Sequence, residues 1–195
     1  MEVPRELVVG KGFVGQLLER ALGADARSLP VPDFRALGVE LKTVPVDARG
    51  RPRESTFVCS AGLDEIARER WETSRVKHKL SCVLLVPIEA EPHVSLEQRR
   101  VGTPLLWTPD DEEESRIRGD WEDLADLIAQ GLVDAVSARR GHVLQLRPKA
   151  SSSRVRREVC APEGERFSTL PRGFYLRRAF MQEVLERRFA LPSGT

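Results

Sequence analysis

The chain contains 195 residues, of which 41% are hydrophobic and 31% charged, and its formal net charge is +1 at pH 7. This length and composition suit one soluble globular domain with a buried core, and no apolar run approaches the roughly 18 residues that a membrane-spanning helix requires. The three cysteines show no C-x-x-C spacing, which argues against a disulfide framework or a zinc site and for free thiols in a reducing compartment. The first residues do not form a signal peptide, so we expect a cytoplasmic protein without a membrane partner.

Acidic and basic residues are concentrated in different parts of the chain. Residues 110–126 contain nine acidic residues against two arginines, a composition typical of a solvated surface. Residues 139–178 contain eleven Lys and Arg against three Glu. Such a one-sided positive field attracts polyanions such as duplex DNA, which carries one negative charge per about 1.7 Å of its axis. The charge alone leaves both nucleic-acid binding and a solvated basic surface open.

The first two thirds of the chain alternate between helical and strand patterns. Residues 14–23 place apolar side chains at helical spacing and end in glycine, which predicts a short amphipathic helix. Residues 38–44 alternate as in a strand, and residues 55–60 predict the return strand of a hairpin. The apolar run 81–88 predicts a central strand buried on both faces. Residues 120–136 predict the longest helix of the chain.

The last third continues this alternation. Residues 142–148 predict a strand that ends at a proline, residues 172–178 a strand or loop, and residues 179–189 an amphipathic helix. Residues 151–159 predict a helix that begins with a serine cap. Because strands and helices are interleaved, the fold class is α/β with a mixed sheet.

Two carboxylates and a lysine form a candidate metal site. Glu40 and Lys42 are two residues apart in a predicted strand, so their side chains leave the same face, and a bend can bring Asp33 back to Glu40. Two carboxylates that meet repel each other unless a cation lies between them, and such oxygen ligands suit Mg²⁺. A lysine beside that ion can orient or deprotonate a water molecule. This D…(D/E)-x-K pattern is found in restriction-endonuclease-like nucleases; a salt bridge on a solvated sheet face is the alternative.

Six segments of the chain occur in an order that resembles one known family. They are GVELKTVPVD, GRPRESTFVC, WETSRVKHKL, QRRVGTPLLW, LRPKA and LPRGFYL. Together they closely resemble the MutH family, the strand-nicking endonucleases of methyl-directed mismatch repair. The resemblance extends from about residue 10 to residue 189. It implies a restriction-endonuclease-like mixed sheet flanked by helices, in a single MutH-like domain (1–195) with a catalytic lobe (about 1–100) and a DNA-reading lobe (101–195) that form a DNA-binding cleft.

The resemblance also implies an activity and its partners. The expected reaction is Mg²⁺-dependent hydrolysis of one phosphodiester in the unmethylated strand at a hemimethylated GATC site. The expected partners are double-stranded DNA, MutL as the activator and MutS indirectly. A single set of catalytic residues suits a monomer that nicks one strand.

Roles for individual catalytic residues follow from the same resemblance. Asp33 and Glu40 are similar in position to the metal-binding carboxylates of the family, and Lys42 to its catalytic lysine. Glu19 is similar to a further acidic residue at the metal, and Lys79 to a second active-site lysine. By their positions alone, Glu19 is a charge on a helix surface and Lys79 a solvated lysine at a strand edge.

The basic segment is expected to contain the DNA-reading residues. Arg147 and Lys149 flank Pro148 at a strand end, a geometry that can present donors to guanine edges or phosphates. The resemblance implies that Tyr175 senses the adenine of GATC and its methylation, and that Lys11 contacts DNA. A core aromatic residue with its hydroxyl at the surface is the other interpretation of Tyr175.

Three alternative functions remain from the sequence. The first is a stand-alone restriction endonuclease of the same fold that cuts both strands at GATC without repair partners. The second is a DNA-binding module with an inactive site, which the complete carboxylate and lysine set argues against. The third is a protein-interaction domain, for which only the charge asymmetry remains. The histidines show no metal-ligand spacing, and no G-x-S-x-G pattern of a hydrolase is present.

Overall fold

The structure is a computed structural model that describes residues 12–26, 29, 31–66, 68–137, 139–149, 157–160 and 166–189, with 157–160 and 166–169 described by their backbone. It divides the chain into two compact units. The first unit comprises Met1–Thr56, Lys79–Thr108 and Met181–Thr195, and the second comprises Phe57–His78 and Pro109–Phe180. The sequence predicted a catalytic lobe before about residue 100 and a DNA-reading lobe after it. Because that division is a division by function, it stays a prediction.

The first unit contains a mixed sheet of three strands in the order β1-β3-β4. These strands are β1 (Glu40–Val46), β3 (Val83–Glu89) and β4 (Leu105–Trp107). β1 and β3 are parallel, whereas β3 and β4 are antiparallel. β3 is therefore central, as its apolar sequence predicted, and most of its side chains are buried. The predicted mixed α/β fold is confirmed at this level.

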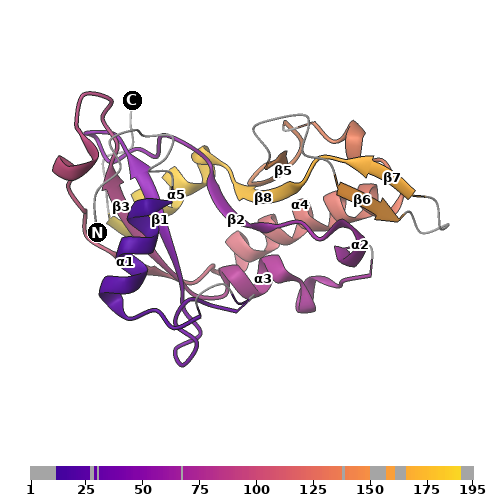
Figure 1. Ribbon diagram of the computed structural model, residues 1–195, viewed down its shortest axis with the longest axis horizontal. Coiled ribbons are helices and arrows are strands. Elements are labelled where there is room, and N and C mark those ends of the chain that lie inside the picture. Colours follow the sequence, from indigo (N-terminus) through magenta and orange to yellow (C-terminus); the bar gives the residue numbers. More distant parts are fainter. Residues whose placement is uncertain are drawn as a thin grey trace. The chain divides into compact units, whose positions relative to one another are not determined.

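Helix α1 (Phe13–Leu22) lies beside β1 in the same unit (Figure 1). It ends at Gly23, which has φ 77°, and the N–H groups of this residue and Ala24 bond back to the last turn. A left-handed conformation costs glycine little, so Gly23 closes the helix as the sequence predicted. α1 also carries Glu19, one of the predicted catalytic residues.

The predicted hairpin between residues 38–44 and 55–60 is wrong. β2 (Thr56–Ser60) pairs with β8 (Arg172–Leu176) in a second sheet of order β2-β8-β5, where β5 is Leu144–Pro148. After β1 the chain makes only an isolated bridge between Val46 and Pro52. The N–H groups of Asp47 and Arg53 donate to the carbonyls of Arg51 and Pro45 on either side of this bridge, at 2.9 and 2.8 Å. Pro45 has no N–H group to return a bond, so the ladder does not extend to earlier residues of β1, and β2 pairs elsewhere.

The second unit is built around α4 (Asp111–Ala129), which begins well before the predicted residue 120. Asp110 caps this helix: its side chain accepts the N–H of Glu113 at 2.8 Å, and the Glu113 carboxylate accepts the N–H of Asp110 at 3.1 Å. Acidic residues in a first turn also favour the positive end of the helix dipole. The acidic run is therefore largely a helix, whose buried stripe contains Ile117, Trp121, Leu124 and Ile128.

The helix predicted over residues 151–159 is also wrong where the chain is described. Residues 157–160 form strand β6 (Arg157–Cys160), which pairs antiparallel with β7 (Arg166–Thr169). Cross-strand pairing overrides the weak local helix signal, and the expected serine cap lies outside the described residues. Residues 172–178, predicted as a strand or loop, contain the strand β8, and the helix predicted over residues 179–189 is confirmed as α5 (Arg178–Phe189).

The remaining elements are short. They are α2 (Leu63–Ile66), η1 (Trp71–Thr73), α3 (Arg75–Leu80), η2 (Leu96–Gln98) and η3 (Val133–Ala135). None of the helices in the described ranges has the length and apolar character to cross a membrane.

Candidate active site

A tight turn brings the two ends of the D…E-x-K pattern together. Phe34 and Val39 form an isolated antiparallel bridge, with N–H to carbonyl distances of 2.9 and 3.3 Å in the two directions. Gly38 closes this turn with φ 65°, a conformation that other residues rarely adopt. Asp33 lies just before the bridge and Glu40 just after it. Oδ2 of Asp33 accepts the N–H of Leu41 at 2.8 Å, which holds the first carboxylate against the start of β1.

Glu40 is buried between two lysines. Its Oε1 lies 2.8 Å from Nζ of Lys42, and its Oε2 lies 2.7 Å from Nζ of Lys79. Lys79, at the end of α3, also donates to the carbonyl of Val31 at 2.7 Å. Only 5% of Glu40 is exposed, so these pairs do not belong to a solvated sheet face. Removing one partner of a buried ion pair leaves a charge without compensation, which is costly.

Glu19 and Asp33 carry carboxyl groups with raised pKa values. Burial raises the pKa of Glu19 most, and the charges of Asp33 and Glu40 raise it further. Burial is also the largest cause of the raised pKa of Asp33; the Leu41 N–H lowers it and the Glu40 charge raises it. Lys42 and Lys79 lower both pKa values in part. The charges of the other four predicted catalytic residues all affect the pKa of Glu19. The five residues therefore form one electrostatic cluster of three carboxylates and two ammonium groups.

This carboxylate–lysine site, defined as Glu19, Asp33, Glu40, Lys42 and Lys79, fits Mg²⁺ in the type of its donors. Carboxylate oxygens are the ligands that Mg²⁺ prefers, and the mutual repulsion of Glu19 and Asp33 is the kind that a cation relieves. Within the described ranges, no group of three or more His, Cys, Asp or Glu is assembled closely enough to hold a metal ion. Both oxygens of Glu40 are instead bonded to lysine ammonium groups.

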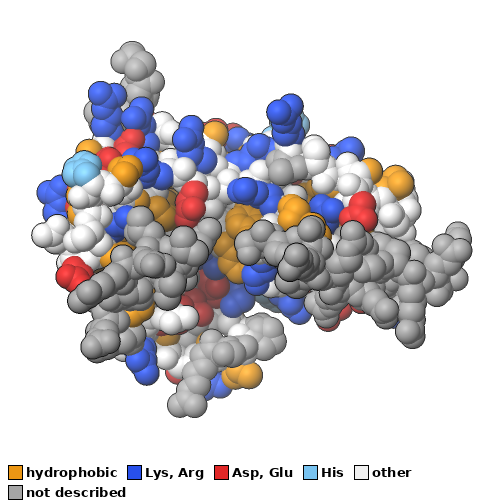
Figure 2. All heavy atoms as spheres, turned by 45° about the horizontal axis from the view of Figure 1, so that its top comes forward, with side chains coloured by type: hydrophobic (Ala, Val, Ile, Leu, Met, Phe, Trp, Pro, Cys, Tyr) orange, Lys and Arg blue, Asp and Glu red, His pale blue; other side chains and the backbone are white. Residues whose placement is uncertain are grey.

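Three of the predicted DNA-reading residues lie together on the second sheet. The Arg147 guanidinium lies 5.4 Å from the centre of the Tyr175 ring. Nζ of Lys149 lies 4.7 Å from the centre of the Phe57 ring and 2.8 Å from Oγ of Ser60. Arg147 and Lys149 are exposed, whereas Tyr175 is half-buried. In Figure 2, Lys and Arg side chains are spread over the face that is shown.

Phe57 is a member of this group that the sequence did not predict. Its ring packs edge-on against Tyr175, with centroids 5.3 Å apart and an interplanar angle of 64°. Gly173 lies close to both rings, since a Cβ there would be 2.9 Å from Phe57, 3.4 Å from Tyr175 and 3.2 Å from the carbonyl of Cys59. The glycine allows this close approach of ring and backbone. The alternation of residues 55–60 was the only signal for Phe57, and it identified a strand.

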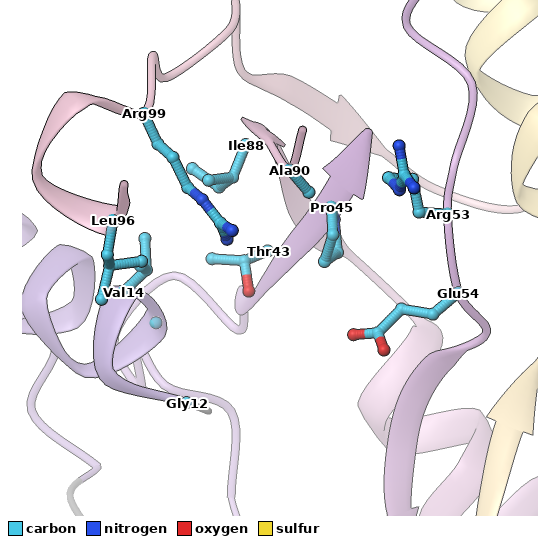
Figure 3. Close-up of a pocket in the computed structure, with 11 residues that line it drawn as sticks. Gly12, Val14, Thr43, Pro45, Arg53, Glu54, Ile88, Ala90, Leu96 and Arg99 are labelled. Carbon is cyan, nitrogen blue, oxygen red and sulfur yellow. The ribbon is translucent and has the colours of Figure 1, made fainter. Parts of the chain in front are cut away.

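The predicted contact Lys11 lies outside the described residues. Gly12, which follows it, lines a cavity of about 440 Å³ in the first unit (Figure 3). Arg99 extends across this cavity toward Thr43. Side chains alternate along a strand, so Thr43 lies on the opposite face of β1 from Lys42. The cavity is therefore separate from the carboxylate–lysine site.

The sequence matches a family model described as MutH, DNA mismatch repair enzyme, over residues 22–120. A DNA mismatch repair protein MutH from Klebsiella pneumoniae (strain 342) is 53% identical over 189 residues, which cover 97% of this chain and 82% of the relative. A protein of the same name from Salmonella paratyphi C (strain RKS4594) is 54% identical over 190 residues, with the same shares covered. At this identity and coverage, the chain belongs to the MutH family of DNA mismatch repair enzymes.

Proposed function

We propose that the carboxylate–lysine site hydrolyses one phosphodiester of the unmethylated strand at hemimethylated GATC, with Mg²⁺ as its cofactor. Membership of the family makes the chain a strand-nicking DNA endonuclease of methyl-directed mismatch repair. The metal, the catalytic residues and the recognised sequence are the parts that we add. The observation that supports the metal and the catalytic residues is the buried Glu40, which is paired with Lys42 and Lys79 and whose charge raises the pKa of Glu19 and Asp33.

Asp33 and Glu40 are the proposed ligands, and Glu19 adds negative charge beside them. When bound, Mg²⁺ supplies activation of a water molecule and compensation of the charge that develops on the phosphate. Asp33 is already held in place by the Leu41 N–H at 2.8 Å. Glu40, in contrast, is bonded to the two lysines through both of its oxygens, so it would have to release part of these contacts to hold the ion.

The two lysines have different proposed roles because they have different hydrogen-bond partners. Lys42 extends from the same strand face as Glu40, and its ammonium group is proposed to donate a hydrogen bond to the attacking water and so to orient it. Lys79 is held by the carbonyl of Val31 as well as by Glu40. It is therefore proposed to keep Glu40 in place and to stabilise negative charge on the phosphate.

Recognition of GATC is proposed for the residues of the second sheet. Arg147 and Lys149 offer donors to guanine edges or phosphates, and Tyr175 is proposed to meet the adenine edge that a methyl group would crowd. Lys11 is a further proposed DNA contact. DNA would lie in a cleft between the catalytic and the DNA-reading lobes of a monomeric, cytoplasmic enzyme that MutL activates and MutS acts on indirectly.

A plasmid with a single GATC site tests the proposal. We expect Mg²⁺-dependent conversion of the unmethylated supercoiled form to the nicked form, and its loss in Glu40→Gln. Glu97→Gln is the matched control, since Glu97 is an exposed residue of the same unit. Nicking by Glu40→Gln at the wild-type rate would contradict the site. Linear product without MutL would instead favour the stand-alone restriction endonuclease.

A further inference from the structure

The buried carboxylate of Asp120, on α4, holds the turn that leads into β5. Only 5% of Asp120 is exposed. Its Oδ2 accepts the N–H of Val143 at 2.6 Å and that of Leu144 at 2.8 Å, and both of its oxygens lie 2.8 Å from the N–H of His142. Consecutive backbone N–H groups that converge on one point form an anion-binding concavity. In this protein the anion is a side chain of the chain itself.

The turn is shaped to fit this carboxylate. Gly141 has φ 85°, and a Cβ at this position would collide with the carbonyl of Leu144 and lie 3.4 Å from Cγ of Asp120. On its other side the turn is tied to the end of β8, because the N–H of Arg177 donates to the carbonyl of Val143 at 2.7 Å. The Asp120 clamp, defined as Asp120 with residues 141–144, therefore fixes the first residue of β5.

Fixing the first residue of β5 fixes its register. β5 pairs antiparallel with β8, with Leu144 opposite Leu176 and Arg147 opposite Gly173. Side chains alternate between the two faces of a strand, so a shift by one residue would move every side chain of β5 to the other face. The side chains of Leu144 and Leu146 are buried. The position of Arg147 in the sheet thus depends on the hydrogen bond between Leu144 and Asp120.

We infer that Asp120 is a positioning residue for DNA recognition, which acts by setting the register of β5. The register places the Arg147 guanidinium 5.4 Å from the ring centre of Tyr175. It also places Nζ of Lys149 2.8 Å from Oγ of Ser60. The inference rests on the proposed role of these residues in reading GATC. Asp120 touches none of the groups that would meet DNA, and it acts through the backbone of β5.

The packing of α4 does not depend on this carboxylate alone. Ile117, Trp121, Leu124 and Ile128 form a separate buried stripe on the same helix. Such a stripe holds a helix in place through its apolar area. Removal of the charge is therefore expected to loosen the start of β5 and to leave the helix in place.

Asp120→Asn in the full chain tests the inference, with Asp123→Asn as the matched control. The control makes the same change of charge on the exposed face of the same helix. Binding is measured in EDTA to a duplex with one GATC site and to the same duplex with that site scrambled. We expect at least about a tenfold loss of affinity for the GATC duplex and less than about a twofold change for the scrambled one, because base contacts specify and phosphate contacts do not. Amide exchange at residues 142–144 should become faster in Asp120→Asn only.

Each outcome separates the inference from the proposed function. A wild-type chain that binds both duplexes equally removes the proposed GATC recognition and the inference with it. Wild-type preference that survives in folded Asp120→Asn contradicts the inference alone, as does an equal loss of affinity for both duplexes. Asp120→Glu, which keeps the charge but moves it by one methylene, replaces Asp120→Asn if that variant lacks a cooperative thermal transition. Unchanged preference in Asp120→Glu, or loss of folding in both variants, also overturns the inference.

Discussion

Nζ of Lys79 lies 2.7 Å from Oε2 of Glu40, although the two residues are 39 positions apart in the chain. Glu40 belongs to β1 and Lys79 to α3, and β3, which follows α3, runs parallel to β1. The parallel pairing places the start of β3 beside the start of β1, because Glu40 is opposite Val83. The end of α3, which directly precedes β3, therefore lies near the start of β1, and Lys79 reaches the carboxylate of Glu40.

We expect Lys79→Met to lower the free energy of unfolding and to abolish nicking. The change leaves one oxygen of a buried carboxylate without its partner, and we expect a loss of about 3 kcal/mol, at the lower end for a broken buried pair, since Lys42 remains. Urea denaturation measures it. Arg100→Ala is the control, because its pair with Glu89 involves a side chain that is 83% exposed, and it should change stability by less than about 1 kcal/mol. Equal losses in the two variants would contradict the buried pair.

We expect Asp33→Asn to stabilise the metal-free protein. The Asp33 carboxyl has a raised pKa, first because of its burial and also because of the Glu40 charge, so its ionisation costs free energy in the folded state. Tm in EDTA should therefore be higher for Asp33→Asn than for the wild type.

Addition of Mg²⁺ provides the second half of the Asp33 test. The wild type should gain thermal stability from Mg²⁺, since an ion that binds only the folded state stabilises it, and Asp33→Asn should gain less. Glu97→Gln, an exposed change in the same unit, should behave as the wild type does in both conditions. A lower Tm of Asp33→Asn in EDTA would show that the carboxylate contributes more as an acceptor than it costs as a charge.

The contribution of Glu114 to stability should depend on pH. Hydrogen bonds from Lys77, at 2.7 Å, and from the indole of Trp71, at 2.9 Å, hold the pKa of this carboxyl below its usual value. A group with a lowered folded-state pKa stabilises the fold above its unfolded pKa, near 4.5, and loses this effect as the pH falls through the folded pKa. Glu114→Gln should therefore be less stable than the wild type at pH 7, and the difference should decrease as the pH falls below the unfolded-state pKa. Asp123→Asn, an exposed change in the middle of the same helix, is the control in denaturant titrations.

Two substitutions at Tyr175 should separate its ring from its hydroxyl. Tyr175→Phe keeps the ring beside Arg147 and Phe57, whereas Tyr175→Ser removes both contacts. We expect both variants to narrow the ratio of nicking rates between unmethylated and fully methylated GATC, and the serine variant also to weaken DNA binding. An unchanged ratio in both would exclude Tyr175 from methylation sensing.

Two glycine substitutions should have opposite effects on stability. In Gly173→Ala the new Cβ would lie 2.9 Å from Phe57 and 3.2 Å from the carbonyl of Cys59, and we expect a loss of about 1–3 kcal/mol from overpacking. Gly119 lies within α4 with nothing within 4 Å of its Cβ position. Gly119→Ala should therefore stabilise the protein by about 0.5–1 kcal/mol, the difference in helix propensity. Thermal denaturation measures both, and a destabilised Gly119→Ala would contradict the open position.

Local sequence patterns determined those elements whose signal lies within a few residues. The apolar run at 81–88 predicted the central strand β3, and Gly23 marked the end of α1. The start of α4 was missed, although Asp110 and Glu113 form a capping box that was visible in the sequence. The D…E-x-K pattern predicted that Asp33, Glu40 and Lys42 lie together, because strand alternation and one turn relate them.

Tertiary structure alone decided which distant segments meet. Alternation in residues 55–60 indicates a strand, but backbone donors and acceptors are alike in every strand, so the pattern could not show that β2 pairs with β8 rather than with β1. Local patterns likewise could not show that Lys79 pairs with Glu40, or that Asp120 accepts hydrogen bonds from the turn before β5. An isolated acidic or basic residue looks like a solvated surface charge in sequence, and only packing reveals that it is buried against a partner.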